Sequence, residues 1–152
     1  MNISRRRLLK TTGAFGILVA AGVITAGQAL AAAGGRAGFE AKTMAEALAA
    51  LGGTPVDSKD IAITSPDIAE NGAVVPVGVT SKVPNTQEIY IFVEKNPTPL
   101  AAIFMIPADT DGRVQTRLKM GQSTNVLVLV KADGKLFSAS KETKVTLGGC
   151  GG

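Results

Sequence analysis

The sequence predicts an all-β protein, an immunoglobulin-like antiparallel β-sandwich with a short N-terminal helix and a flexible C-terminal arm. Three observations lead to this prediction. After Pro55, apolar and polar residues alternate along about eight short stretches, with turn residues at intervals of roughly 8 to 12. Only one stretch has apolar residues at helical spacing. Glycine supplies four of the last five residues, which maximises the freedom of the backbone there.

The first 31 residues have the features of an export signal. A basic stretch from Arg5 to Lys10 precedes an apolar run from Phe15 to Ile24, and Ala29-Leu30-Ala31 matches an A-x-A cleavage site. We therefore expect the mature protein to begin at Ala32. The predicted division of the chain is a signal peptide (1–31), a β-sandwich domain (32–147) and an arm (148–152).

The basic stretch resembles a twin-arginine signal. Ser4-Arg5-Arg6-Arg7-Leu8-Leu9-Lys10 fits that pattern, with leucine where phenylalanine is preferred. A twin-arginine signal implies export of an already folded protein to the periplasm. An ordinary Sec signal or an N-terminal membrane anchor is the alternative interpretation.

Composition excludes several classes of function. Four of the 16 basic residues lie in the predicted leader, which leaves 12 against 12 acidic residues, so no basic face points to nucleic acid or to an anionic membrane. The chain has no histidine, the commonest general base and metal ligand. Its one cysteine rules out an intramolecular disulfide. We expect no metal site and no cofactor.

The elements follow in order. Thr43-Met44-Ala45-Glu46 predicts a capping box, followed by a helix that Gly52-Gly53 ends. Asn71-Gly72, Asp111-Gly112 and Asp133-Gly134 indicate turns between strands. The strands are predicted around Ile61 and Ile63 and over Val74 to Thr80, Glu88 to Glu94, Leu100 to Ile106, Arg113 to Lys119, Asn125 to Lys131, Lys135 to Ser140 and Thr143 to Leu147.

Two features of the strands bear on a partner. Pro76 lies inside a predicted strand, and because proline cannot donate to a β-ladder we expect an edge or a bulge there. Ile89 to Val93 and Val126 to Val130 are almost continuously apolar, which indicates that both of their faces are covered. A second protein covering one face and a central place in the sandwich are both compatible with this pattern.

Cys150 is the predicted functional residue. Gly148 and Gly149 precede it and Gly151 and Gly152 follow it, so the thiol lies on a flexible arm that spans on the order of 10 Å from Leu147. No rigid neighbour is available to lower the thiol pKa. We therefore predict no catalytic residue and a thiol on which other enzymes act, as on a covalent carrier. The alternative is a structural or adhesion-type β-sandwich in which Cys150 forms an intermolecular disulfide, giving a covalent homodimer.

The GGCGG sequence, the segment Ile68-Ala69-Glu70-Asn71-Gly72-Ala73-Val74-Val75-Pro76-Val77 and the twin-arginine leader together resemble the SoxY sulfur carriers of the thiosulfate-oxidising Sox system. The resemblance implies an immunoglobulin-like fold, a heterodimer with the β protein SoxZ, and thiosulfate-derived sulfur held covalently on Cys150. It also implies that the folded pair is exported together on this chain's leader.

The resemblance further implies a cycle of enzymes acting on Cys150. The cytochrome SoxXA couples thiosulfate to the thiol, the hydrolase SoxB releases sulfate, and SoxCD, where present, oxidises the remaining sulfur. The carrier itself catalyses no step. Its mature form is expected in the periplasm, without a membrane anchor.

Overall fold

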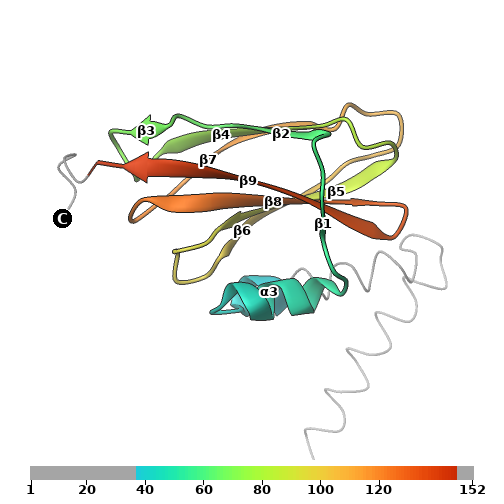
Figure 1. Ribbon diagram of the computed structural model, residues 1–152, viewed down its shortest axis with the longest axis horizontal. Helices are drawn as coiled ribbons and strands as arrows, with labels where there is room; N and C mark the ends of the chain where they lie inside the picture. Colours follow the sequence, from blue (N-terminus) through green and yellow to red (C-terminus); the bar gives the residue numbers. More distant parts are fainter. Residues whose placement is uncertain (1–36, 147–152) are drawn as a thin grey trace, which may run out of the picture.

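The structure is a computed structural model that describes residues 37–146. The predicted leader (1–31) and arm (148–152) lie outside the described residues. Two β-sheets pack face to face, and a short helix lies across the outer face of the larger sheet (Figure 1). This arrangement confirms the predicted all-β sandwich with a small N-terminal helix. Within residues 37–146, no helix is long and apolar enough to cross a membrane.

The helix α3 (Met44–Leu51) begins and ends where the sequence predicts. Thr43 Oγ1 accepts a hydrogen bond from the Glu46 backbone N–H at 3.2 Å, and Glu46 Oε2 accepts from the Thr43 backbone N–H at 3.2 Å, which completes the capping box. Backbone N–H groups of Lys42 and Thr43 hold the pKa of the Glu46 carboxyl below its usual value. Gly52 ends the helix at a positive φ of 65°.

The strands form two sheets. The larger has the order β1-β9-β8-β5-β6, with β3 also paired to β9, and the smaller has the order β2-β4-β7. Neighbours are antiparallel except for β1 and β3, which both run parallel to β9. The strands are β1 (Val56–Asp57), β2 (Ile61–Thr64), β3 (Ile68–Ala69), β4 (Val75–Ser81), β5 (Thr86–Val93), β6 (Leu100–Met105), β7 (Arg113–Leu118), β8 (Thr124–Ala132) and β9 (Lys135–Val145).

Two strand predictions need correction. The stretches predicted separately as Lys135 to Ser140 and Thr143 to Leu147 are one strand, because Lys141 and Glu142 keep their pairing with β8. The strand that contains Pro76 is the central strand of the smaller sheet, not an edge. This strand, β4, pairs with β2 only from Gly78 onward, so Pro76 has β7 as its one neighbouring strand. The missing N–H of Pro76 therefore removes no hydrogen bond to β2.

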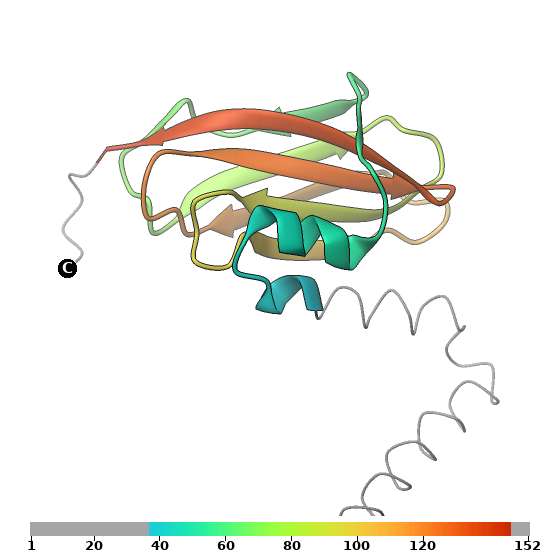
Figure 2. The ribbon, with the colours of Figure 1, turned by 60° about the horizontal axis from the view of Figure 1, so that its bottom comes forward.

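The core explains why β5 and β8 are almost wholly apolar. One of their faces, including Ile91 and Val128, packs between the two sheets. The opposite face, including Phe92 and Leu129, packs beneath Ala47 of α3 (Figure 2). Both faces are therefore covered within the chain itself, and the alternative in which these are central sandwich strands is confirmed. A second protein is not needed to explain their composition.

Candidate functional site

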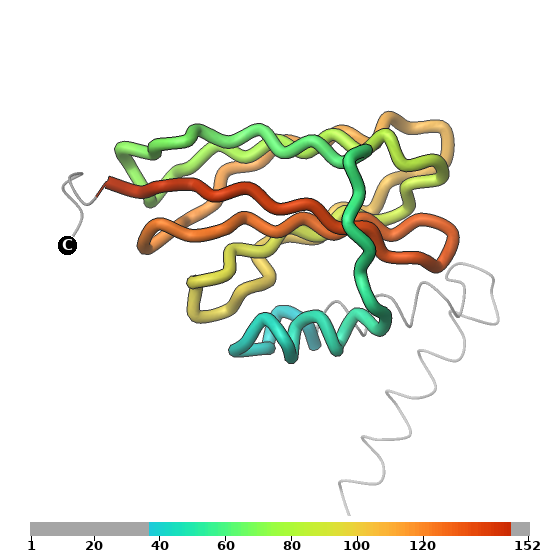
Figure 3. The backbone as a smooth tube through the Cα atoms, viewed as in Figure 1, coloured from blue at the N-terminus to red at the C-terminus, as the bar shows by residue number. Residues whose placement is uncertain are grey.

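The end of β9 is the structural root of the predicted arm. The strand ends at Val145, and Thr146 is the last described residue, four positions before Cys150. Cys150, Gly148, Gly149, Gly151 and Gly152 lie outside the described residues. β9 runs the length of the sandwich and ends at one extremity of the molecule (Figures 1 and 3). The structure thus defines the point from which the arm begins.

A short strand holds this root from one side. In β3, Ile68 pairs with Lys144 and Ala69 pairs with Val145. The Lys144 N–H donates to the Asp67 carbonyl at 2.9 Å, and the Thr146 N–H donates to the Ala69 carbonyl at 3.0 Å. Main-chain hydrogen bonds therefore fix the chain up to Thr146.

The loop after β3 presses against the same strand end. A Cβ on Gly72 would lie 2.3 Å from the Met120 carbonyl oxygen and 2.8 Å from Val145 Cγ1, so only glycine fits there. The Met120 N–H donates to the Gly72 carbonyl at 2.7 Å, and the Asn71 side chain accepts from the Ala73 N–H at 2.9 Å. The turn predicted at Asn71-Gly72 is confirmed, and close backbone approach explains its glycine.

Ser123 holds the root from another side. Its Oγ accepts a hydrogen bond from the Val145 N–H at 2.9 Å. We call residues 67–74 together with Ser123 the root clasp. The segment Ile68 to Val77, which the sequence singles out without giving it a physical role, supplies most of this clasp. Sequence reasoning missed it because β3 has only two residues and pairs with a strand about 75 residues away.

Charges near the root are mixed in sign. Lys141 Nζ lies 3.1 Å from Asp67 Oδ1 and donates to the Ser65 carbonyl at 2.7 Å. Ser65 Oγ and Thr143 Oγ1, both buried, are 2.9 Å apart and share a hydrogen bond. No single sign of charge dominates the described surface around the end of β9. The end of β9 is therefore held mainly by hydrogen bonds to its main chain, and the charges beside it do not form a site of one sign.

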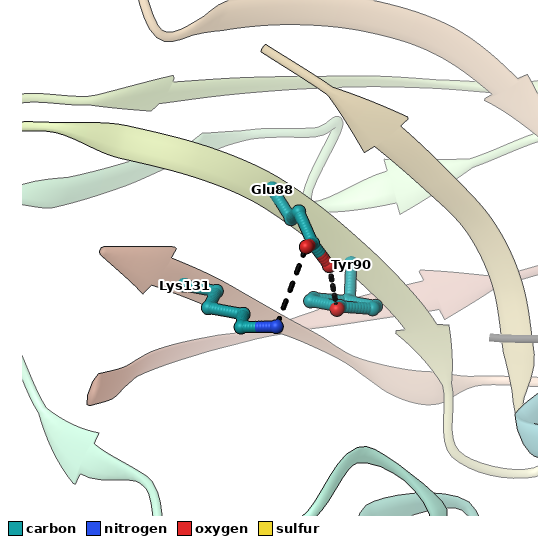
Figure 4. A network of polar contacts seen from close by, with 3 residues as sticks. All are labelled: Glu88, Tyr90 and Lys131. Atoms are coloured by element: carbon teal, nitrogen blue, oxygen red, sulfur yellow. Dashed lines mark hydrogen bonds and ion pairs between the residues drawn. The ribbon is translucent and has the colours of Figure 1, made fainter. Parts of the chain in front are cut away.

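A second polar cluster, which the sequence did not reveal, lies on the α3 side of the larger sheet. The Tyr90 hydroxyl donates to Glu88 Oε2, and Lys131 Nζ lies 3.4 Å from Glu88 Oε1 (Figure 4). Burial, and then the neighbouring Glu88, raise the pKa of Tyr90 above its usual value, so it remains a donor. Among the described residues no buried side-chain polar atom lacks a partner, and no three acidic, histidine or cysteine side chains form a metal-binding group. The Glu88 carboxylate is therefore paired within the cluster, by the Tyr90 hydroxyl on one oxygen and by Lys131 on the other.

Comparison with known proteins identifies the family. The model of the family described as "Sulfur oxidation protein SoxY" matches residues 47–150, from within α3 to Cys150. The chain belongs to the SoxY family. The structure of the sulfur carrier protein SoxY from Chlorobium limicola f thiosulfatophilum is 37% identical, with a TM-score of 0.64, over 69% of this chain and 97% of that one.

A second solved structure shares less with the chain. A PKD domain of a peptidase from a Thermoplasmatales archaeon is 14% identical, with a TM-score of 0.42, over 62% of this chain and 98% of that one, and it carries no argument about function. No curated protein matches the chain. The SoxY likeness is supported by the family model and by the Chlorobium structure.

Proposed function

We propose that this protein is a sulfur carrier of the Sox system, which holds sulfur compounds covalently on Cys150 and presents them to partner enzymes. One observation carries the proposal. The family match extends to Cys150, the one cysteine of the chain, and the chain is clasped four residues before it. A carrier needs a body that stays folded while its thiol enters other proteins, and the clasp separates these two parts.

The chemistry takes place between the Cys150 thiol and enzymes that supply the catalytic groups. In the first step a sulfur–sulfur bond forms between Cys150 and the sulfane sulfur of thiosulfate. The thiol proton is released, and two electrons pass to a c-type cytochrome, the role of SoxXA. In the second step SoxB adds water across the bond to the sulfone, so that sulfate and two protons leave and a persulfide anion stays on Cys150. SoxCD, where it is present, oxidises that sulfur.

The proposed location and stable partner follow from other features. Residues 1–31 are a twin-arginine signal that delivers the folded protein to the periplasm. SoxZ is the heterodimer partner. Its docking is supported by β6, which pairs with β5 alone among the described strands, has no charged side chain to block strand addition, and exposes Met105.

Intact mass spectrometry tests the function. Wild-type protein incubated with thiosulfate, SoxXA and oxidised cytochrome should gain the mass of one thiosulfate group, and dithiothreitol should remove it. Cys150→Ser should gain nothing and should abolish thiosulfate-dependent turnover, while its far-UV spectrum and Tm stay close to wild type. Retained turnover in Cys150→Ser would refute the proposal. A quantitative disulfide dimer without adducts on a non-reducing gel would favour the structural alternative.

A further inference from the structure

Two exposed apolar side chains lie on the root clasp. Ile68 is 59% exposed and Val74 is 51% exposed. They are two of the five large apolar side chains exposed among the described residues; the others are Phe39, Val56 and Met105. Neither Ile68 nor Val74 belongs to the core, so both side chains are available for contact with another protein.

Both side chains belong to segments in direct contact with the end of β9. Ile68 pairs with Lys144, which places it about 7 Å along the strand from Thr146. Val74 follows two residues after Gly72, whose position is fixed against Val145. The loop between β3 and β4 lies at the same extremity of the sandwich as the end of β9 (Figure 3). The apolar pair therefore lies beside the origin of the arm.

The length of the arm determines what can cover this surface. Four residues separate Thr146 from Cys150, so the backbone between them spans at most about 14 Å. An enzyme that takes Cys150 into a recessed active site must bring the mouth of that site within this distance of Thr146. Its rim then meets the root clasp.

We propose that Ile68 and Val74 are the docking surface for the enzymes that act on sulfur bound to Cys150, and that the occupant is an apolar rim around the mouth of their active sites. This inference rests on the proposed carrier function. The neighbouring charges are mixed, and Lys141 and Asp67 pair with each other, so contact here depends on apolar burial rather than on electrostatic steering. A patch of two side chains binds weakly, which suits a carrier that must leave each enzyme in turn.

Steady-state kinetics with the carrier as substrate provide the test. The Ile68→Thr, Val74→Thr double variant keeps β-branched side chains, and so the strand preference, but loses apolar surface. With SoxB and the thiosulfate adduct of the carrier, we expect KM to rise about tenfold and kcat to change less than about twofold. Alkylation of the free thiol by iodoacetamide should keep its wild-type rate.

Val56→Thr is the matched control. Val56 is 62% exposed and, like Ile68, is the first residue of a two-residue strand parallel to β9, but it pairs near the start of that strand. The KM of SoxB for the Val56→Thr carrier should equal that for the wild-type carrier. A wild-type KM in the double variant, or an equal rise in Val56→Thr, would overturn the docking proposal.

Two readouts keep the outcomes distinct. Amide exchange at Val145 and Thr146 reports whether the root clasp of the double variant is intact. If the clasp is lost, Val74→Thr alone is used, because it leaves β3 unchanged. This single variant should raise KM about threefold, and an unchanged KM would overturn the proposal. If instead the proposed carrier function is wrong, intact mass spectrometry will find no adduct on Cys150 of the wild-type protein.

Discussion

β1 and β3 are two short strands on the same edge of β9, and they hold it in different ways. Each has two residues, runs parallel to β9 and begins with an exposed branched side chain. At β1, the side chain of Asp57 accepts a hydrogen bond from Ser138 Oγ at 2.7 Å, and the Ser58 N–H donates to the Ser138 carbonyl. At β3, Ala69 is buried, and backbone N–H groups of β9 and Thr146 donate to the carbonyls of Asp67 and Ala69.

The difference follows what each strand has to hold. β1 attaches the connection between α3 and the sandwich, and there the Asp57–Ser138 side-chain hydrogen bond adds to the main-chain pairing. β3 fixes Lys144 to Thr146, the last described residues before the predicted arm, and under the proposed function fraying there would lengthen the tether of the thiol. Main-chain hydrogen bonds and the contact at Gly72 do not depend on side-chain rotamers. They therefore restrict the position of the end of β9 more than a side-chain hydrogen bond would.

The largest expected effect is on the β3 side. Gly72→Ala places a Cβ against the Met120 carbonyl and Val145, and relieving that overlap should lower the free energy of unfolding by about 3 kcal/mol. Urea denaturation measures this change. Gly121→Ala is the control, because no atom lies within 4 Å of the Cβ position there, and it should change stability by less than about 0.5 kcal/mol. Equal stability of the two variants would show that the loop does not clasp β9.

A smaller effect is expected on the β1 side. Asp57→Ala removes the acceptor of the buried Ser138 hydroxyl and should cost about 1 kcal/mol. The double variant with Ser138→Ala should lose little more than Asp57→Ala alone, because both partners are then absent. Additive losses in this cycle would mean that the two side chains do not interact.

The smallest effect is expected from the ion pair at the clasp. Asp67→Asn removes the partner of Lys141, but the Asp67 side chain is 90% exposed and its carbonyl still accepts from the Lys144 N–H. We expect a Tm shift of less than about 2 °C that disappears in about 1 M NaCl. A larger, salt-resistant loss would indicate that side-chain charge, not the main chain, holds β3.

The sequence was informative where local chemistry decides the structure. The capping box at Thr43 and Glu46 fixed the start of α3, and the Asp133-Gly134 turn has both residues at positive φ, as its composition predicts. Period-two alternation located β4 and β7, in which more buried residues alternate with more exposed ones. For the candidate site, the isolated Cys150 among glycines predicts a tethered thiol, and this prediction lies outside the described residues.

The rest depends on pairing between distant segments, which composition does not encode. Continuous apolar strands indicated that both faces of β5 and β8 are covered, but not that α3 covers one of them. Lys141 and Glu142 suggested a break in β9, although β8 pairs straight through them. Gly72 was recognisable as a turn residue, whereas the backbone that excludes any other residue comes from the loop after β7 and the end of β9.

The continuous pairing of β9 also has a mechanical consequence. β9 is bonded to β8 from Lys135 to Thr143, and these hydrogen bonds lie across the strand direction. A pull along β9 would load these hydrogen bonds in shear, so that many must break together rather than one after another. In the proposed carrier function, the sandwich would therefore bear repeated insertion and withdrawal of the arm without unfolding from that end.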